Sequence, residues 1–415
     1  MQGRKVVVIG AGMVGLSVAW QALQRGAEVV VVERETPAAG SSWGNAGWIS
    51  PALAVPLAEP SVVQFGIRSL FDPNSPLYLA PRADPTLVRF GLRFLLDCTM
   101  DKWRRTMASY VPLNRRAFAA FDALGEHLAG DDRAATPTAP IWAAFRTEED
   151  MAGLRREIEL INQAGLTLET EEVGADVLHQ HLPFLTDEVA AGIRIDGQRH
   201  LNGGDYVDAL ADAFVAAGGE LRTGAVRDVR RSAGPVVCEL AGGATIESDD
   251  VVIANGAWMP KLMKRHGVHV PLVAGRGYSF RVDVPNWEEP QCFYLPVQRV
   301  ACTPVDGRLR IAGTMEFRPV DAPLDKNRID AIINSIDPLI EGIDFEARTD
   351  EWVGGRPVTA DSLPLVGATK TPGVWIAGGH GMWGITLGPL TGELLVEQMA
   401  TGRPDPMLVP LNPLR

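Results

Sequence analysis

The first 34 residues alternate between apolar runs and a helical pattern that is punctuated by glycine. Residues 5–9 form an apolar run, residues 10–15 read GAGMVG, and apolar positions then recur at helical spacing up to Gly26. A second apolar run follows and closes at Glu33. The pattern predicts a strand, a tight glycine turn, a helix and a second strand over residues 5–34, which together form a βαβ unit.

The rest of the chain changes its period several times. Residues 50–85 are rich in proline and have no clear period, so we expect them to form an extended excursion over the surface. After Thr147, whose hydroxyl is expected to cap a helix, the helical pattern stops at Gly165. Helices are predicted within 86–128, 148–165, 203–219, 325–340 and 390–402, and strands within 219–231, 235–240, 249–258, 271–316 and 373–379, those of 271–316 being antiparallel.

Composition and charge narrow the class of protein. With 46% hydrophobic and 22% charged residues, a chain of 415 residues is expected to fold into at least two soluble globular domains. Its 39 Lys and Arg against 51 Asp and Glu give a net charge of -12, which would repel polyanions, so nucleic acid is not expected as a partner. No apolar run of about 20 residues occurs, so no transmembrane segment is predicted, and peripheral membrane contact stays open.

The four cysteines do not indicate a metal site. Cys98, Cys238, Cys292 and Cys302 follow neither the spacing of metal ligands nor the dense pattern of a disulfide framework. We expect them to be reduced structural thiols, and we predict no metal site. The protein is expected to be cytoplasmic, with peripheral contact to the inner face of the membrane left open.

The glycine turn carries the first candidate chemistry. In a G-x-G-x-x-G turn the first glycine, Gly10, permits the tight bend, Gly12 lets a pyrophosphate approach the backbone, and Gly15 lets the helix pack closely on the strand. Glu33 would accept hydrogen bonds from ribose hydroxyls and would disfavour a 2′-phosphate. A dinucleotide site is therefore predicted. Nucleotide-style elements recur later in the chain, and a long ligand that reaches all of them favours FAD over NAD.

The order of the elements predicts an interleaved α/β fold. A Rossmann-type FAD-binding domain alternates along the chain with a substrate domain of the α+β class, built on an antiparallel sheet. The FAD-binding domain is assigned to residues 1–85, 190–265 and 350–415. The substrate domain is assigned to residues 86–189 and 266–349.

Five stretches of the chain, taken together, resemble one family. They read VVVIGAGMVGLSVAWQALQRGAEVVVVER, GSSWGNAGWISP, DDVVIANGAW, GGRPVTADSLPLVG and GGHGMWGITLGPLTGELLVEQMATGRP. The chain resembles the FAD-dependent oxidoreductases of the D-amino acid oxidase and glycine oxidase type, above all the bacterial D-amino acid dehydrogenases, over essentially its whole length. The resemblance implies non-covalent FAD, and Cys302 is not expected to bind the flavin.

The motifs and the resemblance together imply a set of cofactor-binding residues. The segment GSSWGNAG, which follows Glu33, would reach the flavin. The backbone of Val226 would meet the adenine, and the late glycine turn at 378–384 would bring main-chain amides to the flavin. The predicted set is Gly10, Gly12, Met13, Val14, Gly15, Glu33, Arg34, Ser41, Ser42, Asn45, Ala46, Gly47, Val226, Gly256, Gly379, Gly381, Gly384, Ile385 and Thr386.

The resemblance also implies the residues that meet the substrate. Arg356 would hold the substrate carboxylate through a bidentate guanidinium pair, and the carbonyl of Met382 would receive the amine. Tyr294 would border the substrate, and His380 is a candidate base or a residue that orients the loop. Weaker candidates are Tyr278 and Trp383 as pocket walls and Arg276 as a second anchor.

The predicted function is oxidative deamination of a small amino acid, either a D-amino acid or D-proline or hydroxyproline. The resemblance implies hydride transfer from Cα to flavin N5, which gives an imino or 2-oxo acid, with a quinone or O₂ as the final acceptor. One alternative is a glycine or sarcosine oxidase that uses O₂. Alternatives from another class are a non-catalytic FAD-binding protein and the flavin domain of a tRNA-modifying enzyme.

Overall fold

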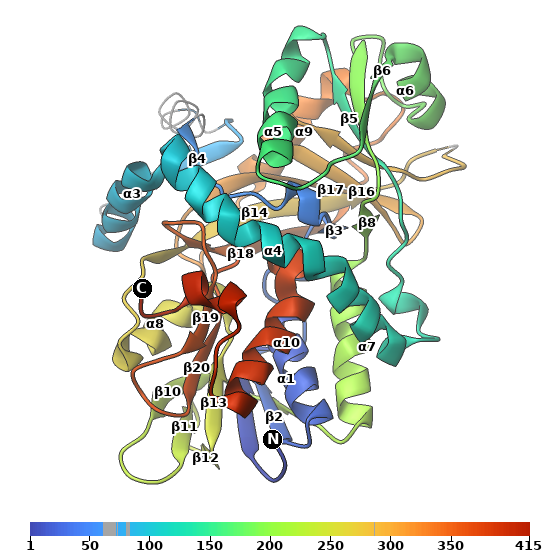
Figure 1. Ribbon diagram of the computed structural model, residues 1–415. Coiled ribbons are helices and arrows are strands. Elements are labelled where there is room, and N and C mark those ends of the chain that lie inside the picture. Colours follow the sequence, from blue (N-terminus) through green and yellow to red (C-terminus); the bar gives the residue numbers. More distant parts are fainter. Residues whose placement is uncertain (61–71, 73, 80–83, 286) are drawn as a thin grey trace.

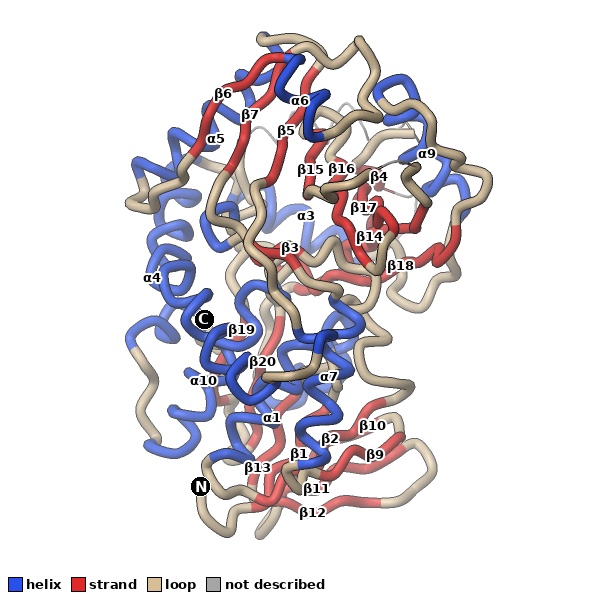
Figure 2. The backbone as a smooth tube through the Cα atoms, turned by 90° about the vertical axis from the view of Figure 1, so that its right-hand side faces the viewer, coloured by secondary structure: helices blue, strands red, loops and turns tan. Residues whose placement is uncertain are grey.

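The computed structural model describes residues 1–60, 72, 74–79, 84–285 and 287–415. Two sheets lie one above the other in Figure 1, and both chain termini lie in the lower half. The turned view in Figure 2 shows the same two layers of strands, with the long helices packed along one side of them. The predicted mixed α/β architecture is confirmed.

The lower sheet has six strands in the order β19-β20-β13-β1-β2-β9. All neighbours in it are parallel except β19, which pairs antiparallel with β20. The predicted βαβ unit at the N-terminus forms its centre. The bounds are β1 Lys5–Ile9, β2 Glu28–Glu33, β9 Glu220–Thr223, β13 Asp250–Ile253, β19 Leu365–Ala368 and β20 Val374–Gly378.

Both faces of the lower sheet are covered, which explains why its central strands are apolar at every position. In β1, Val6 and Val8 pack in the core with helices α1, α7 and α10, whereas Val7 and Ile9 pack with strands β10 and β11 of a small second sheet. The covering elements are α1 Met13–Gln24, α7 Gly203–Ala216, α8 Met259–Met263, α10 Gly384–Thr401, β10 Val226–Arg230, β11 Val236–Leu240 and β12 Thr245–Ser248.

The upper sheet has nine strands in the order β18-β14-β17-β16-β15-β5-β7-β6, with β4 beside β17. The predicted antiparallel strands of residues 271–316 form its middle and are confirmed. The bounds are β4 Leu77–Leu79, β5 Ile141–Phe145, β6 Thr170–Gly174, β7 Ala191–Ile195, β14 Leu272–Val282, β15 Cys292–Leu295, β16 Val300–Val305, β17 Arg308–Phe317 and β18 Thr349–Thr359. A short pair, β3 Trp48–Ile49 with β8 Arg199–His200, lies apart from both large sheets.

Helices also cover the upper sheet. Ile329 and Ile332 of α9 and Leu178 of α6 share one apolar core with the strands, and α5 packs in the core that continues down to α4 and α10. The bounds are α3 Pro85–Asp97, α4 Met100–Gly125, α5 Ala152–Gln163, α6 Ala175–His181 and α9 Lys326–Ile336.

Most of the predicted elements are present, with shifted ends. The first helix ends at Gln24, two residues before the predicted stop, and Gly26 follows in the left-handed region with φ +80°. The Thr147 hydroxyl accepts the N–H of Asp150 at 3.2 Å, as a cap does. Strand β12 was not predicted, because its alternating pattern is short. Much of the predicted excursion over 50–85 lies outside the described residues.

The observed strand pairing crosses the predicted boundaries between the FAD-binding domain and the substrate domain. Strands β7 and β18 pair within the upper sheet, although the sequence boundaries put both in the FAD-binding domain. Helix α4, assigned to the substrate domain, packs against α10. An apolar pattern predicts a strand or a helix but does not say which neighbour it will join, so the domain boundaries stay a prediction.

Candidate functional site

The first cavity lies at the carboxyl ends of the lower sheet's parallel strands and has a volume of about 470 Å³. In open α/β sheets ligands bind at this edge, because loops and helix N-termini converge there. The lining residues come from stretches far apart in the sequence. They include Ile9, Gly10, Gly12, Met13, Val14, Glu33, Arg34, Ser41, Ser42, Asn45, Val226, Ala254, Asn255, Gly256, Trp258, Arg356, Gly378, His380, Gly381, Met382, Gly384 and Ile385.

The glycine turn between β1 and α1 is shaped for close backbone approach. Gly10 has φ +108°, and a Cβ placed on it would lie 2.8 Å from the carbonyl oxygen of Ala254. A Cβ on Gly15 would lie 2.0 Å from the carbonyl oxygen of Gly10, so helix and strand touch there. The N–H of Met13, at the start of α1, donates to Ser42 Oγ at 3.2 Å. The turn thus opens the N-terminus of α1 to the cavity.

The acidic residue at the end of β2 lies beside this turn. One oxygen of Glu33 accepts the N–H of Ala11 at 2.8 Å, and the other accepts the N–H of Glu35 at 3.2 Å. The guanidinium of Arg34 lies over the ring of Trp258, 4.5 Å from its centroid. Trp258 was not predicted, although an aromatic residue directly after the strand motif ANGA was a usable signal.

Side chains of the upper sheet hold the segment 41–47 by its carbonyl oxygens. Ser279 Oγ donates to Gly44 O at 2.8 Å, and Thr303 Oγ1 donates to Ala46 O at 2.6 Å. The buried Arg310 donates through Nη1 to Asn45 O at 3.2 Å. Burial lowers the pKa of Arg310 to about 10, which leaves it cationic at neutral pH. The upper sheet therefore positions a wall of the lower sheet's cavity.

The late glycine turn connects β20 to α10. Gly379 and Gly381 have φ +74° and +56°, which residues with a side chain rarely adopt. The N–H of Gly381 donates to Pro357 O at 3.0 Å, which ties the turn to β18. Gly384 begins α10, whose first N–H groups have no partner within the helix. The turn offers main-chain donors to whatever occupies the cavity.

His380 is held inside this turn as a neutral imidazole. Its Nε2 lies 2.9 Å from Thr391 Oγ1, and that hydroxyl donates to Leu387 O at 2.8 Å, so Nε2 is the donor to it. Nδ1 is buried and has no hydrogen-bond partner among the described residues. Burial lowers the pKa of His380 to about 4. A base with so low a pKa is weak at neutral pH, which favours the predicted loop-orienting role over the catalytic one.

The low pKa of His380 predicts a pH dependence of stability. Between pH 6.5 and 4 the unfolded imidazole binds a proton that the folded one refuses, so the free energy of unfolding falls as the pH falls through this range. We expect a loss of about 3 kcal/mol from this residue. Urea unfolding at pH 7 and pH 4 should show that the stability advantage of the wild type over His380→Gln shrinks by this amount. An advantage that stays constant would contradict a buried neutral histidine.

Arg356 lies where β18 approaches the lower sheet's cavity. Its Nη1 donates to the carbonyl oxygen of Thr314 at 3.0 Å, and no acidic side chain pairs with it among the described residues. Burial lowers its pKa to about 10, so the guanidinium stays charged at neutral pH. A Cβ on Gly277, in the neighbouring strand, would lie 2.2 Å from Arg356 Nη2. Because Gly277 has no side chain, the guanidinium of Arg356 can occupy this space.

A second cavity, of about 490 Å³, lies on the other side of Arg356. Asn45, Arg356 and Met382 line both cavities, so the two volumes meet at these residues. Tyr294 lines only the second cavity, where its ring meets Trp48 edge-on at 5.6 Å. The other residues of this wall are mostly apolar and include Leu57, Leu77, Leu79, Leu87, Phe90, Phe94, Ala301, Ala312, Met315, Phe317 and Trp383.

The structure brings most of the predicted site residues to these two cavities. All four predicted catalytic residues line one of them or both. Of the predicted cofactor residues, fourteen line the first cavity and Ala46 lines the second. Those that line neither are Gly15, Gly47, Gly379 and Thr386.

Some weaker candidates lie elsewhere, for identifiable reasons. The Tyr278 hydroxyl is buried and donates to Glu316 Oε2 at 2.7 Å, so Tyr278 is not a pocket wall. Arg276 Nη2 donates to the carbonyl oxygens of Ala322 and Pro323 at 2.7 and 2.9 Å, and it lines neither cavity, so it is not a second anchor. Thr386 lies in the first turn of α10, and its Oγ1 donates to the carbonyl oxygen of Trp48 at 3.2 Å.

The residues of the first cavity fit an FAD molecule. Its glycine turn offers N–H groups where a Cβ would block the approach, and Glu33 lies at the ribose position of the motif. Asn255 Oδ1 and His380 Nδ1 are buried atoms without a partner in the described structure, and both residues line the cavity. Cys302 is buried and lines neither cavity, so nothing indicates a covalent bond from it to the cofactor.

Known sequences are similar to this chain over almost its whole length. The family model described as FAD dependent oxidoreductase matches residues 5–398. A D-amino acid dehydrogenase of Cereibacter sphaeroides is 29% identical over 411 residues, which cover 97% of this chain and 93% of that protein. Another of the same name from Xanthobacter autotrophicus is 28% identical over 410 residues, which cover 97% and 96%.

Solved structures share the fold over its whole length. Glycine oxidase from Geobacillus kaustophilus matches with a TM-score of 0.75 and 23% identity, over 99% of each chain. L-Proline dehydrogenase from P. horikoshii matches with a TM-score of 0.68 and 17% identity, over 100% of this chain and 98% of that one. The family match shows that the cofactor is FAD and that the protein is an oxidoreductase. The chain belongs to the FAD-dependent oxidoreductases of the DAO family.

Proposed function

We propose that this enzyme oxidises the Cα–N bond of an amino acid whose carboxylate is held by Arg356. The observation that carries the proposal is a half-buried guanidinium, without an acidic partner among the described residues, at the junction of the two cavities. A planar guanidinium pairs with a carboxylate through two parallel hydrogen bonds, which fix both position and angle. The acid would therefore be oriented with its Cα toward the first cavity.

The remaining residues of the junction would align the substrate and exclude water. The carbonyl of Met382 is the proposed acceptor for the amine, and Trp48 and Tyr294 close the wall of the second cavity. Burial raises the pKa of Tyr294 to about 12, so its hydroxyl stays protonated and can donate. If the amine arrives neutral, no side-chain base is needed, which agrees with the neutral His380.

FAD, when bound, supplies the acceptor for the two electrons that leave Cα as a hydride. The residues that would hold it are the fourteen predicted ones that line the first cavity, with the glycine turn at the pyrophosphate and the N-terminus of α10 at the electron-rich edge of the ring. Water would then hydrolyse the imino acid to a 2-oxo acid and ammonia. The chain's contribution is alignment, desolvation and fixed dipoles.

The lining of the second cavity favours substrates with an apolar side chain. Apart from Arg356 and Arg299, its described walls carry no charged side chain, and they include Phe90, Phe94 and Phe317. The names of the relatives support the D configuration. Among D-amino acids, those of leucine, methionine or phenylalanine size would bury most surface there.

An anaerobic panel of D-, L- and N-methyl amino acids, read as loss of flavin absorbance, tests the function and the preference together. We expect the D isomers of leucine, methionine and phenylalanine to give kcat/KM values at least about tenfold above those of glycine and sarcosine, because each buried methylene strengthens binding. Glycine or sarcosine as the best substrate would instead support the oxidase alternative. If no amino acid bleaches the flavin, the non-catalytic alternative gains.

We propose a quinone-type acceptor and a cytoplasmic location with peripheral membrane contact, on the strength of the dehydrogenase names of the relatives. In the described ranges, none of the helices has the length and apolar composition that crossing a bilayer requires. Stopped-flow mixing of the reduced protein with air-saturated buffer separates the two acceptors. Slow recovery of the oxidised spectrum supports a quinone, and rapid recovery supports O₂.

A further inference from the structure

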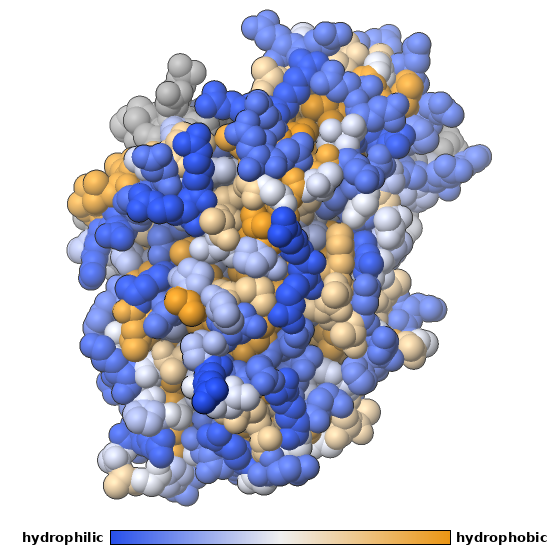
Figure 3. Space-filling view, in the orientation of Figure 1, coloured by the Kyte–Doolittle hydropathy of each residue, from blue (hydrophilic) through white to orange (hydrophobic). Residues whose placement is uncertain are grey.

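One helix carries a concentrated exposed apolar face. Val88, Leu92, Leu95 and Leu96 of α3 are 58%, 62%, 51% and 64% exposed, whereas an apolar side chain normally loses most of its exposure on folding. Their spacing places them on one side of the helix. Figure 3 shows hydrophobic atoms gathered at the left edge of the molecule, where Figure 1 shows α3. Scattered apolar residues need no explanation, but a continuous patch does.

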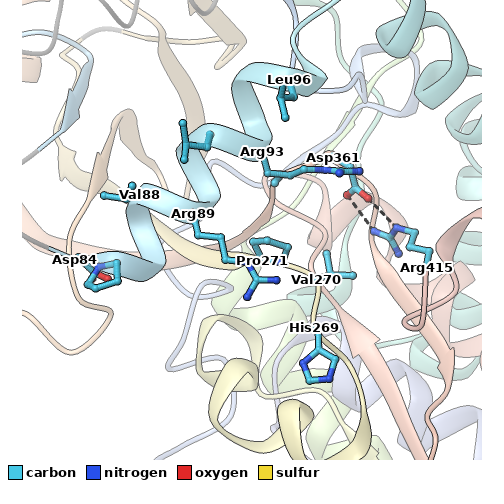
Figure 4. A pocket seen from close by; sticks show the side chains of 13 residues that line it. Asp84, Val88, Arg89, Arg93, Leu96, His269, Val270, Pro271, Asp361 and Arg415 are labelled. Carbon is cyan, nitrogen blue, oxygen red and sulfur yellow. Dashed lines mark hydrogen bonds and ion pairs between the residues drawn. The ribbon is translucent and has the colours of Figure 1, made fainter.

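The exposed face of α3 borders an open groove of about 930 Å³. Figure 4 shows Val88 and Leu96 on α3, with Val270, Pro271 and His269 across the groove. The groove lies apart from the two cavities of the active site, since it shares no lining residue with either. Its lining is largely apolar and carries three arginines, Arg89, Arg93 and Arg415, against two aspartates, Asp84 and Asp361, of which Asp361 pairs with Arg415.

The charge around α3 is opposite in sign to that of the whole chain. Residues 84–105, which span α3 with its capping residue and the start of α4, hold five Lys and Arg and three Asp, whereas the whole chain holds 39 against 51. Arg93 and Arg104 are 58% and 62% exposed, and they form surface ion pairs with Asp97 and Asp101. Charges farther away than about 10 Å are screened at physiological salt, so this local excess outweighs the net charge of -12.

Folding does not need the exposed face of α3. The opposite face holds the helix in place, because Phe90 is 4% exposed and packs with Val358 and Ala360. Asp84 caps the helix by accepting the N–H groups of Thr86 and Leu87 at 2.9 and 3.3 Å. An amphipathic arrangement with one apolar face in the core and a second one in water is stable only if the second is small or meets a partner.

We propose that α3 docks this protein on an anionic phospholipid bilayer, with Val88, Leu92 and Leu96 among the acyl chains and the neighbouring arginines at the headgroups. Apolar side chains flanked by basic ones are the pattern that lies in the bilayer interface, and each basic side chain adds attraction to anionic lipid. A second copy of this chain is disfavoured as the occupant, because two equally basic faces repel each other. The docking does not rest on the proposed amino acid oxidation.

Docking through α3 would place the active site beside the bilayer. Leu87, Phe90 and Phe94, on the inner face of the same helix, line the second cavity. One helix would thus separate the lipid from the substrate, and a lipid-soluble electron acceptor would be concentrated next to the site.

Vesicle co-sedimentation of the full-length, FAD-loaded protein tests the proposal. We expect binding to vesicles of phosphatidylglycerol mixed with phosphatidylcholine, weaker binding to phosphatidylcholine alone, and weakening with added salt. The double variant Leu92→Glu/Leu96→Glu should lower the partition coefficient at least about tenfold, because it removes two apolar groups and adds two negative charges. Arg89→Gln/Arg104→Gln should weaken binding to the anionic vesicles alone.

The matched control is Val215→Glu, on α7, where the native side chain is also exposed, at 49%. It should bind like the wild type. Equal binding by the Leu92→Glu/Leu96→Glu variant, or a wild-type dimer in light scattering that this variant abolishes, would overturn the proposal. Turnover with a soluble dye as acceptor should be unchanged in that variant, so a failure of docking and a failure of the proposed oxidation are distinguishable.

Discussion

Replacement of Arg356 by alanine should lower kcat/KM for the best amino acid by about 10²- to 10⁴-fold. The variant loses two charge-assisted hydrogen bonds to the substrate carboxylate, each of which contributes about 1.5–3 kcal/mol. Because no described acidic side chain pairs with Arg356, its loss leaves no orphaned carboxylate in the structure. Steady-state kinetics with a dye acceptor, together with the absorbance spectrum of the bound flavin, measure the effect.

Two further variants separate anchoring from simple damage. Arg356→Lys keeps the positive charge but loses the bidentate geometry, so its kcat/KM should lie between those of the wild type and Arg356→Ala. Arg265→Ala, whose side chain is 69% exposed and pairs only with Asp228 among the described residues, should behave like the wild type. Wild-type kcat/KM in Arg356→Ala, with the flavin bound normally, would end the proposed role of this residue.

Substitution of Gly10 by alanine should weaken FAD binding at least about a hundredfold. At φ +108° a side chain strains the backbone by about 1–3 kcal/mol, and the new Cβ would lie 2.8 Å from Ala254 O, so the turn must move away from the cavity. The measurement is a titration of the apoprotein with FAD, followed by flavin fluorescence. Circular dichroism checks that the remaining fold is intact.

The control for Gly10→Ala is Gly234→Ala. Gly234 has a similar φ of +99°, but a Cβ there meets nothing within 4 Å, and it lies between β10 and β11. This variant carries the backbone strain without the contact at the cofactor turn. Its FAD affinity should equal that of the wild type. If both variants lose FAD alike, general destabilisation is the cause and the assigned role of the turn is wrong.

Local patterns in the sequence were enough to predict the elements at the cofactor cavity. The βαβ unit follows from apolar runs and three glycines that lie within thirty residues of one another, and the structure has it at the centre of the lower sheet. Gly10, Glu33 and the late glycine turn could be predicted as cofactor-site residues. A glycine is required where the backbone adopts a positive φ, and a carboxylate is required to accept hydrogen bonds from ribose. Arg356 was named through the resemblance, since a lone arginine has no pattern of its own.

Alternation along a strand explains where residue-by-residue prediction failed. Tyr278 and Gly277 are neighbours on β14, yet a Cβ on Gly277 would meet Arg356 whereas Tyr278 packs in the core on the other face. The sequence does not say which face of a strand that is buried on both faces meets the cavity. The phenylalanines of the second cavity were missed for another reason, because an aromatic residue reads equally well as core.

The sequence alone determined the nucleotide-binding elements, the antiparallel strands and the class of cofactor, because these depend on short-range periodicity and on glycines that only one backbone shape requires. The tertiary structure decided that β7 and β18 join the upper sheet, that Asn45, Arg356 and Met382 meet between two cavities, and that one apolar face of α3 is left exposed. Those outcomes arise from contacts between segments far apart in the chain, and such contacts leave no local trace in hydrophobic periodicity.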